Sequence, residues 1–195
     1  MADCVVLASG SGSNFEAIAT RLADSPHRLL SLICDQPDAP VIARAERLLV
    51  PVLRISYVES RREAECRLER ALSSLAPDLV VLAGYMRILP AAIVDLFAGR
   101  IVNIHPSLLP AFAGLHALER SYADPDSAMG VSVHVVDHGV DTGPLLAQFE
   151  ADRTGEPDLV QMEERIHTLE HRHYPRIVAE QLDAIDRYRG VRASR

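Results

Sequence analysis

Short apolar runs alternate with amphipathic stretches along most of the chain. The apolar runs predict strands over residues 4–9, 29–34, 51–55, 79–84, 99–105, 131–137 and 144–150. The amphipathic stretches predict helices over 14–23, 40–48, 59–75, 116–123 and 159–187, the last one broken near Pro175. Strands that alternate with helices in this way indicate an α/β fold with a mainly parallel sheet.

Two of these segments indicate how the layers are arranged. The helix expected at 59–75 places Ala64, Leu68, Ala71, Leu72 and Leu75 on one stripe, which can cover a sheet. The run 79–84 is apolar throughout, as expected for a central parallel strand covered on both faces. We therefore expect a single-domain three-layer sandwich with a mainly parallel, Rossmann-like central sheet. The domain would span 1–190, with a short tail at 191–195.

Composition excludes several classes of protein function. The chain has 195 residues, 48% of them hydrophobic, which suits one domain with a full core. A net charge of −7 gives no indication of a polybasic surface for nucleic acid or membrane. All 20 basic residues are arginine, so lysine Schiff-base chemistry and the Walker P-loop are excluded.

The cysteines and the N-terminus indicate a cytoplasmic protein. Cys4, Cys34 and Cys66 are scattered and have no CxxC spacing, which favours reduced thiols. The start "MADCVVLASG" lacks the basic region of a targeting segment and reads as the first strand. No apolar run approaches the roughly 20 residues that a membrane span requires.

Two polar residues end the strand expected at 99–105. Ile101, Asn103 and His105 share one face, because side chains two apart in a strand point the same way. The carboxyl end of a strand is where open α/β sheets bind ligands, and Pro106 keeps His105 extended. An Asn–His pair there suits a developing oxyanion, whereas a merely satisfied polar histidine is the alternative.

A Gly-rich turn, "ASGSGSNFEAI", links the first strand to the first helix and could bind an anion. A plain turn capped by Ser13 or Asn14 is the alternative. A dinucleotide fold is a weaker one: Gly10 and Gly12 precede an Asp35 at suitable spacing, but Phe15 stands at the third glycine position.

Histidine pairs with HxxxH spacing, His134/His138 and His167/His171, lack a companion ligand cluster, so we expect no metal. Alternation places Ser132 and His134 on one face of their strand, where they either support a site or face solvent.

Several longer motifs resemble the folate-dependent formyltransferases, in particular those that act on glycinamide ribonucleotide. They are "VVLASGSGSN", "APDLVVLAGYMRIL", "NIHPSLLP", "GLH", "SVHVVDHGVDTGP" and "LEHRHYP", and they cover most of the chain. The resemblance implies a one-carbon transferase of de novo purine biosynthesis, which moves a formyl group from 10-formyltetrahydrofolate to the primary amine of glycinamide ribonucleotide. It implies small-molecule substrates, no metal, no nucleic acid or membrane partner, and a monomer or homodimer.

The resemblance also implies catalytic roles. Asn103 and His105 would hold the formyl oxygen, while Asp141 would interact with His105 and help to move protons. Ser132 and His134 resemble supporting residues. Because a nearby carboxylate favours imidazolium, we expect Asp141 to raise the pKa of His105.

Binding roles follow in the same way. The phosphate of the ribonucleotide would lie on Gly12, Ser13 and Asn14, with Glu170 contacting the same substrate. Arg61 or Arg62 would meet the carboxylate tail of the folate, or lie on a solvated helix face. The pterin would lie between two walls formed by Met86, Arg87, Ile88 and Leu89 and by Asp137, His138, Gly139, Val140 and Asp141.

One stretch departs from the family pattern. Ala111 and Ala113 stand where members commonly carry a basic residue and a proline, which indicates either a variant acceptor or a replaceable contact. Other functions to be distinguished are a formyltetrahydrofolate deformylase, which passes the group to water, a methionyl-tRNA formyltransferase, which normally has a further C-terminal domain and a basic face, and a nucleotide-binding module without catalysis.

Overall fold

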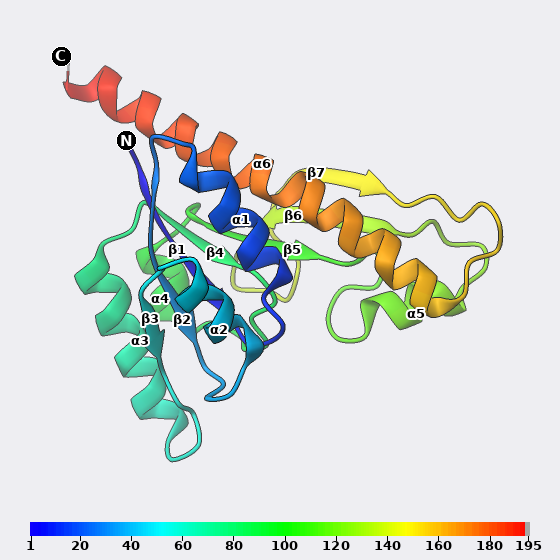
Figure 1. Ribbon diagram of the computed structural model, residues 1–195, viewed down its shortest axis with the longest axis horizontal. Helices are drawn as coiled ribbons and strands as arrows, with labels where there is room; N and C mark the ends of the chain where they lie inside the picture. The colour runs from blue at the N-terminus through cyan, green and yellow to red at the C-terminus, as the bar shows by residue number, and fades with distance from the viewer. Residues whose placement is uncertain (194–195) are drawn as a thin grey trace.

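The computed structural model describes residues 1–193, through which a seven-stranded sheet runs (Figure 1). The spatial order is β3-β2-β1-β4-β5-β6-β7. Neighbours from β3 to β5 are parallel, β6 is antiparallel to β5, and β7 is antiparallel to β6. The strands are β1 (Asp3–Ala8), β2 (Arg28–Cys34), β3 (Val52–Arg54), β4 (Leu79–Leu82), β5 (Ile101–His105), β6 (Gly130–Val135) and β7 (Leu145–Glu150).

Helices cover both faces of the sheet and complete a three-layer α/β sandwich, as the sequence predicted. One buried cluster joins the sheet to α1, α2 and α6, and a second cluster joins the opposite face to α3 and α4. The helices are α1 (Ser13–Ala23), α2 (Pro40–Arg47), α3 (Arg61–Leu75), α4 (Ala91–Leu96), α5 (Ala117–Ala123) and α6 (Leu159–Ala193).

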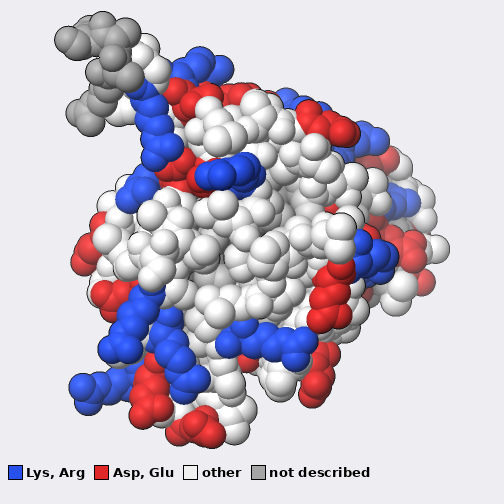
Figure 2. All heavy atoms as spheres, turned by 60° about the vertical axis from the view of Figure 1, so that its left-hand side comes forward, with Lys and Arg blue, Asp and Glu red and all other residues white. Residues whose placement is uncertain are grey.

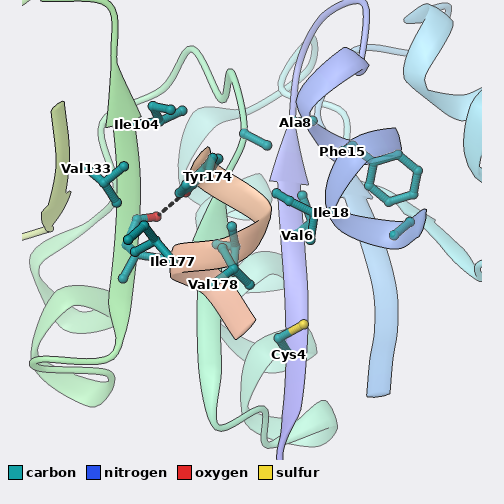
Figure 3. Packing of buried hydrophobic residues seen from close by; sticks show 14 of the residues in the cluster. Cys4, Val6, Ala8, Phe15, Ile18, Ile104, Val133, Tyr174, Ile177 and Val178 are labelled. Carbon is teal, nitrogen blue, oxygen red and sulfur yellow. Dashed lines mark hydrogen bonds between the residues drawn. The ribbon is translucent and has the colours of Figure 1, made fainter. Parts of the chain in front are cut away.

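The alternation of β1 shows how the two clusters are divided. Cys4, Val6 and Ala8 face α1 and α6 (Figure 3). Val5 and Leu7 face the α3 side. Because both faces are covered, the whole strand from Cys4 onward is buried, which explains its continuous apolar sequence.

The prediction that the last helix breaks near Pro175 was wrong. Proline removes one backbone donor, yet α6 runs from Leu159 to Ala193 with Pro175 inside it. Tyr174, Ile177 and Val178 on either side of the proline are buried against the sheet and α1. This packing holds both halves of the helix in line. Residues 194 and 195 of the expected tail lie outside the described residues.

Two local details also differ from the sequence prediction. Helix α4 was not predicted, because six residues with only Ile93 and Val94 buried give too little periodicity. Helix α1 begins at Ser13, and neither Ser13 nor Asn14 caps it: the N-cap is Gly12, whose φ is 79°. The turn before α1 therefore leaves the Asn14 side chain available for another contact.

The strand order brings three connecting segments together. Strands β1, β4 and β5 are parallel neighbours, so the segments that follow their carboxyl ends lie at one edge of the sheet. These segments hold the Gly-rich turn at 9–12, the loop 83–90 and the long loop that follows His105. Among the described residues, no helix is both long and apolar enough to cross a membrane.

Candidate active site

Asn103 and His105 lie at the carboxyl end of β5, on the sheet face that α3 and α4 cover lower down. The antiparallel pairing of β5 with β6 sets His134 opposite Asn103 and Ser132 opposite His105. All four side chains therefore belong to two adjacent strands. His105, Ser132 and His134 are buried, whereas Asn103 is half-buried at the edge.

Asp141 joins this group from the loop between β6 and β7. One carboxylate oxygen lies 3.2 Å from His105 Nδ1 and accepts the Gly114 N–H at 2.9 Å. The other lies 3.4 Å from His134 Nε2 and makes a long contact of 3.5 Å with Asn103 Nδ2. Asp141 has a φ of 55°, a left-handed conformation that aspartate tolerates better than most residues. The structure thus brings the three predicted catalytic residues together.

Asp141 is charged at neutral pH because its neighbours lower its pKa. The hydrogen bond with His134, supported by the Gly114 N–H, lowers the pKa of Asp141 to about 2. Asp141 is therefore a fixed negative charge at neutral pH. Its contribution to stability is complete above the ordinary carboxyl pKa and is lost as the pH falls toward 2.

Asp141 raises the pKa of His105 as predicted, but it does not set the direction of the net shift. Asp141 and the Phe112 carbonyl both favour the imidazolium, but burial of the ring outweighs them and lowers the pKa of His105 below its ordinary value. His105 Nε2 lies 3.0 Å from the Phe112 oxygen, and Nδ1 faces Asp141. Because both oxygens only accept, both contacts are hydrogen bonds only when the ring is protonated. His105 is thus placed to hold a proton that its burial disfavours.

Backbone groups complete the site, and the sequence did not reveal them. Phe112, with φ 56°, turns its carbonyl toward His105, and Arg120 from α5 donates to the same oxygen at 2.7 Å and to that of Ala113 at 2.6 Å. The loop that carries Ala111 and Ala113 is therefore held from α5. A carbonyl or an amide has no residue type of its own, so no sequence motif could indicate these contacts.

Ser132 supports the segment after β5 rather than reaching the edge itself. Its hydroxyl donates to the Ser107 carbonyl at 2.6 Å and accepts the Leu109 N–H at 2.9 Å. Gln148 of β7, which sequence reasoning missed, donates to the Ser132 hydroxyl and to the Leu109 carbonyl. These bonds fix the start of the loop that Phe112 later turns toward His105.

The residues predicted to hold a phosphate lie on the other face of the same edge. Asn14 Nδ2 donates to Glu170 Oε2 at 2.9 Å, which joins α1 to α6, while the buried Asn14 Oδ1 has no partner among the described residues. Burial raises the pKa of Glu170. At Gly12, a Cβ would lie 2.4 Å from a Val41 methyl, so only glycine fits this turn.

Asp35, the acid of the dinucleotide alternative, is engaged elsewhere. It is buried, and its carboxylate pairs with Arg87, whose guanidinium also lies 4.0 Å from the centre of the Tyr57 ring. A ribose would have to displace this pair. The arrangement disfavours the dinucleotide alternative and gives the Arg87 side chain a contact that the predicted pterin wall did not include.

Loop 84–89 and loop 137–141 present the other residues of the predicted walls. Met86, Ile88 and Val140 are exposed, whereas Leu89 is buried, and the Met86 N–H is tied to the Ser9 hydroxyl at 3.0 Å. Apolar side chains held at an open edge suit a flat heterocycle.

The remaining predicted contacts lie on the surface. Asp137 accepts from Gly139 and Thr142 within its own loop, and His138 lies 3.0 Å from Asp95. Arg61 pairs with Glu65 on the exposed face of α3. Among the described residues, no three His, Cys, Asp or Glu side chains are grouped so that they could hold a metal ion.

A separate cavity of about 610 Å³ lies between the end of β7 and the start of α6 and contains neither Asn103 nor His105. The candidate site is therefore the open sheet edge and not this cavity.

Fixed donors and a carboxylate–histidine pair at the carboxyl edge of a parallel sheet define an enzyme suited to acyl transfer. Residues 2–178 match the family model described as formyl transferase, and the chain belongs to this family. It is 41% identical over 182 residues to a phosphoribosylglycinamide formyltransferase of Bacillus subtilis, covering 91% of this chain and 93% of the relative.

Solved structures agree. A glycinamide ribonucleotide transformylase of Geobacillus kaustophilus superposes with a TM-score of 0.87 at 43% identity, covering 93% of this chain and 99% of the other. A phosphoribosylglycinamide formyltransferase of Streptococcus pneumoniae gives 0.86 at 37% identity, with the same coverage.

Proposed function

We propose that this enzyme transfers a formyl group from 10-formyltetrahydrofolate to the primary amine of glycinamide ribonucleotide. The observation that carries the proposal is the shared edge of the sheet. Asn103, His105 and Asp141 meet at this edge, and the two walls predicted for the pterin and the Asn14–Glu170 contact lie at the same edge. The similarity to named formyltransferases over nine-tenths of the chain supports the same substrates.

The proposed mechanism uses only side chains of this site. The amine attacks the formyl carbon, and the carbonyl electron pair moves to the oxygen. Asn103 Nδ2 donates to that oxyanion, and the Nε2–H of His105 is shared between the Phe112 carbonyl and the same oxyanion. Collapse of the intermediate breaks the bond to the folate nitrogen, which gains the proton that the amine loses. His105, paired with Asp141, holds or passes this proton at the edge.

Acceptance of the formyl group by the amine distinguishes a transferase from a deformylase. We expect loss of the formyl folate, followed spectroscopically, to depend on added glycinamide ribonucleotide, because the Gly12–Asn14 turn and Glu170 provide a place for the acceptor. A reaction that releases formate equally fast without the ribonucleotide would favour the deformylase instead.

Inorganic phosphate should compete with the ribonucleotide and not with the folate. The physical reason is that the amides of the turn before α1 and the positive end of that helix favour an anion. Initial rates measured with each substrate varied in turn at several phosphate concentrations test this assignment. Competition against the folate would place the two ligands the other way round.

The remaining proposals concern partners and location. On the face shown in Figure 2, arginines are interspersed with acidic residues around an uncharged centre, which fits small-molecule substrates better than tRNA. Cys4, Cys34 and Cys66 are all free thiols, as suits the reducing cytoplasm in which we place the enzyme. A monomer or homodimer remains the predicted assembly.

A further inference from the structure

The hydroxyl of Tyr174 connects α6 to two neighbouring strands. Tyr174 is fully buried, and its hydroxyl lies 2.8 Å from the Leu82 carbonyl oxygen of β4 and 3.1 Å from the Val102 carbonyl oxygen of β5. Figure 3 shows the side chain among Ile104, Val133 and Ile177, with a hydrogen bond drawn as a dashed line. One O–H is thus shared between two backbone acceptors.

Both acceptor carbonyls belong to peptide groups directly before segments of the candidate active site. The Val102 carbonyl is part of the peptide bond to Asn103. The Leu82 carbonyl is part of the peptide bond to Ala83, after which the chain forms loop 84–89. Leu82 and Asn103 are also register partners between β4 and β5. The hydroxyl therefore fixes the position at which β5 and loop 84–89 leave the sheet. Strand β5 carries Asn103, and loop 84–89, called the donor loop below, is the loop predicted to contact the formyl folate.

The same helix also contacts the proposed acceptor site. Glu170 lies four residues before Tyr174, so the two side chains lie on one face of α6. Glu170 holds Asn14 at the start of α1, one turn along the helix from the contact with Leu82 and Val102. A single helical face thus connects the Gly-rich turn, the donor loop and the catalytic strand.

A purely structural role does not explain the hydroxyl. Phenylalanine would fill the same apolar space without placing a polar group in it, so packing alone does not require the hydroxyl. Burial also raises the pKa of Tyr174, so the hydroxyl stays protonated and can only act here as a donor toward these oxygens. What it adds is a fixed position for two peptide groups.

We infer that Tyr174 is a positioning residue, which sets Asn103 and the donor loop in register with the acceptor site through the Val102 and Leu82 carbonyls. The inference rests on the proposed formyl transfer. Displacement of a reacting group by about 1 Å can cost on the order of 10²-fold in rate. Loss of the hydroxyl should relax the strands by less, so we expect kcat of Tyr174→Phe to fall about 10-fold, with either KM changed by less than about 3-fold.

Tyr122→Phe is the matched control. Tyr122 also donates to a carbonyl, that of Pro157 at 3.2 Å, but it packs beside α6 away from Asn103. Its loss should leave kcat unchanged. If Tyr174→Phe keeps the parental kcat, or if both variants lose kcat in parallel with thermal stability, Tyr174 is only a packing residue and the inference fails.

A second pair of variants covers a folding defect in Tyr174→Phe. At position 174, 4-fluorophenylalanine occupies the space of the hydroxyl without donating, whereas 4-aminophenylalanine donates. We expect the first to show the same roughly 10-fold loss and the second to stay within about 2-fold of the parent. Equal kcat values for the two would overturn the inference. Failure of the parent itself to formylate the ribonucleotide would instead reject the proposed function, and the amide resonances of Asn103 would still report the effect of the hydroxyl.

Discussion

Replacing His105 with alanine should lower kcat by at least about 10²–10³-fold, with little change in either KM. Losses of this order follow removal of one donor to the oxyanion in acyl-transfer sites. KM should hold because the contact strengthens only as charge develops on the formyl oxygen. Asn103→Ala should give a loss of the same order. The double variant should lose less than the product of the two, because both side chains act on one oxygen atom.

His27→Ala is the matched control for this experiment. His27 is buried like His105 and also lies beside an aspartate, since its Nε2 is 3.0 Å from Asp183, but it sits at the start of β2, at the opposite edge of the sheet. Its loss should lower the melting temperature and spare kcat. A folded His105→Ala enzyme with near-normal kcat per molecule would mean that β5 ends in this histidine for packing alone.

The sequence predicted the parts of the site that depend on strand periodicity and on strand order. Asn103 and His105 share a face because they are two apart, and parallel strands deliver such residues to one edge. Alternation also paired Ser132 with His134. It could not show that β6 runs antiparallel beside β5, and it is this pairing that makes both residues buried neighbours of the catalytic pair.

Other features depend on contacts distant in the chain. The left-handed backbone at Phe112 has no sequence signal, so the carbonyl on His105 was not foreseen. The pKa of His105 depends on burial of the ring, which lowers it, and on the charge of Asp141, which raises it. The sequence indicated only the effect of the charge. Pro175 was read as a break because local propensity says nothing of the packing on either side of it.

Asp141→Asn should be the other variant with a large effect, a fall in kcat of about 10²-fold or more, which is the lower end for a group that assists proton transfer. Asparagine tolerates the left-handed backbone and can still accept the Gly114 N–H, so the loop should keep its shape. What is removed is the charge beside His105. Asp152→Asn is the control, since Asp152 also has a pKa lowered by hydrogen bonds in a turn, those from Thr154, but lies after β7.

The pH dependence gives this variant a signature that a loss of stability cannot imitate. Asp141 has a pKa of about 2, so it is charged throughout the working range and does not itself titrate there. Its charge raises the pKa of His105 against the larger effect of burial. Removing that charge leaves burial less opposed, and the pKa of His105 falls further. The limb of the kcat profile that His105 governs should therefore move to lower pH in Asp141→Asn and stay in place in Asp152→Asn. A limb that stays in place in both variants would show that Asp141 acts on the loop and not on the proton of His105.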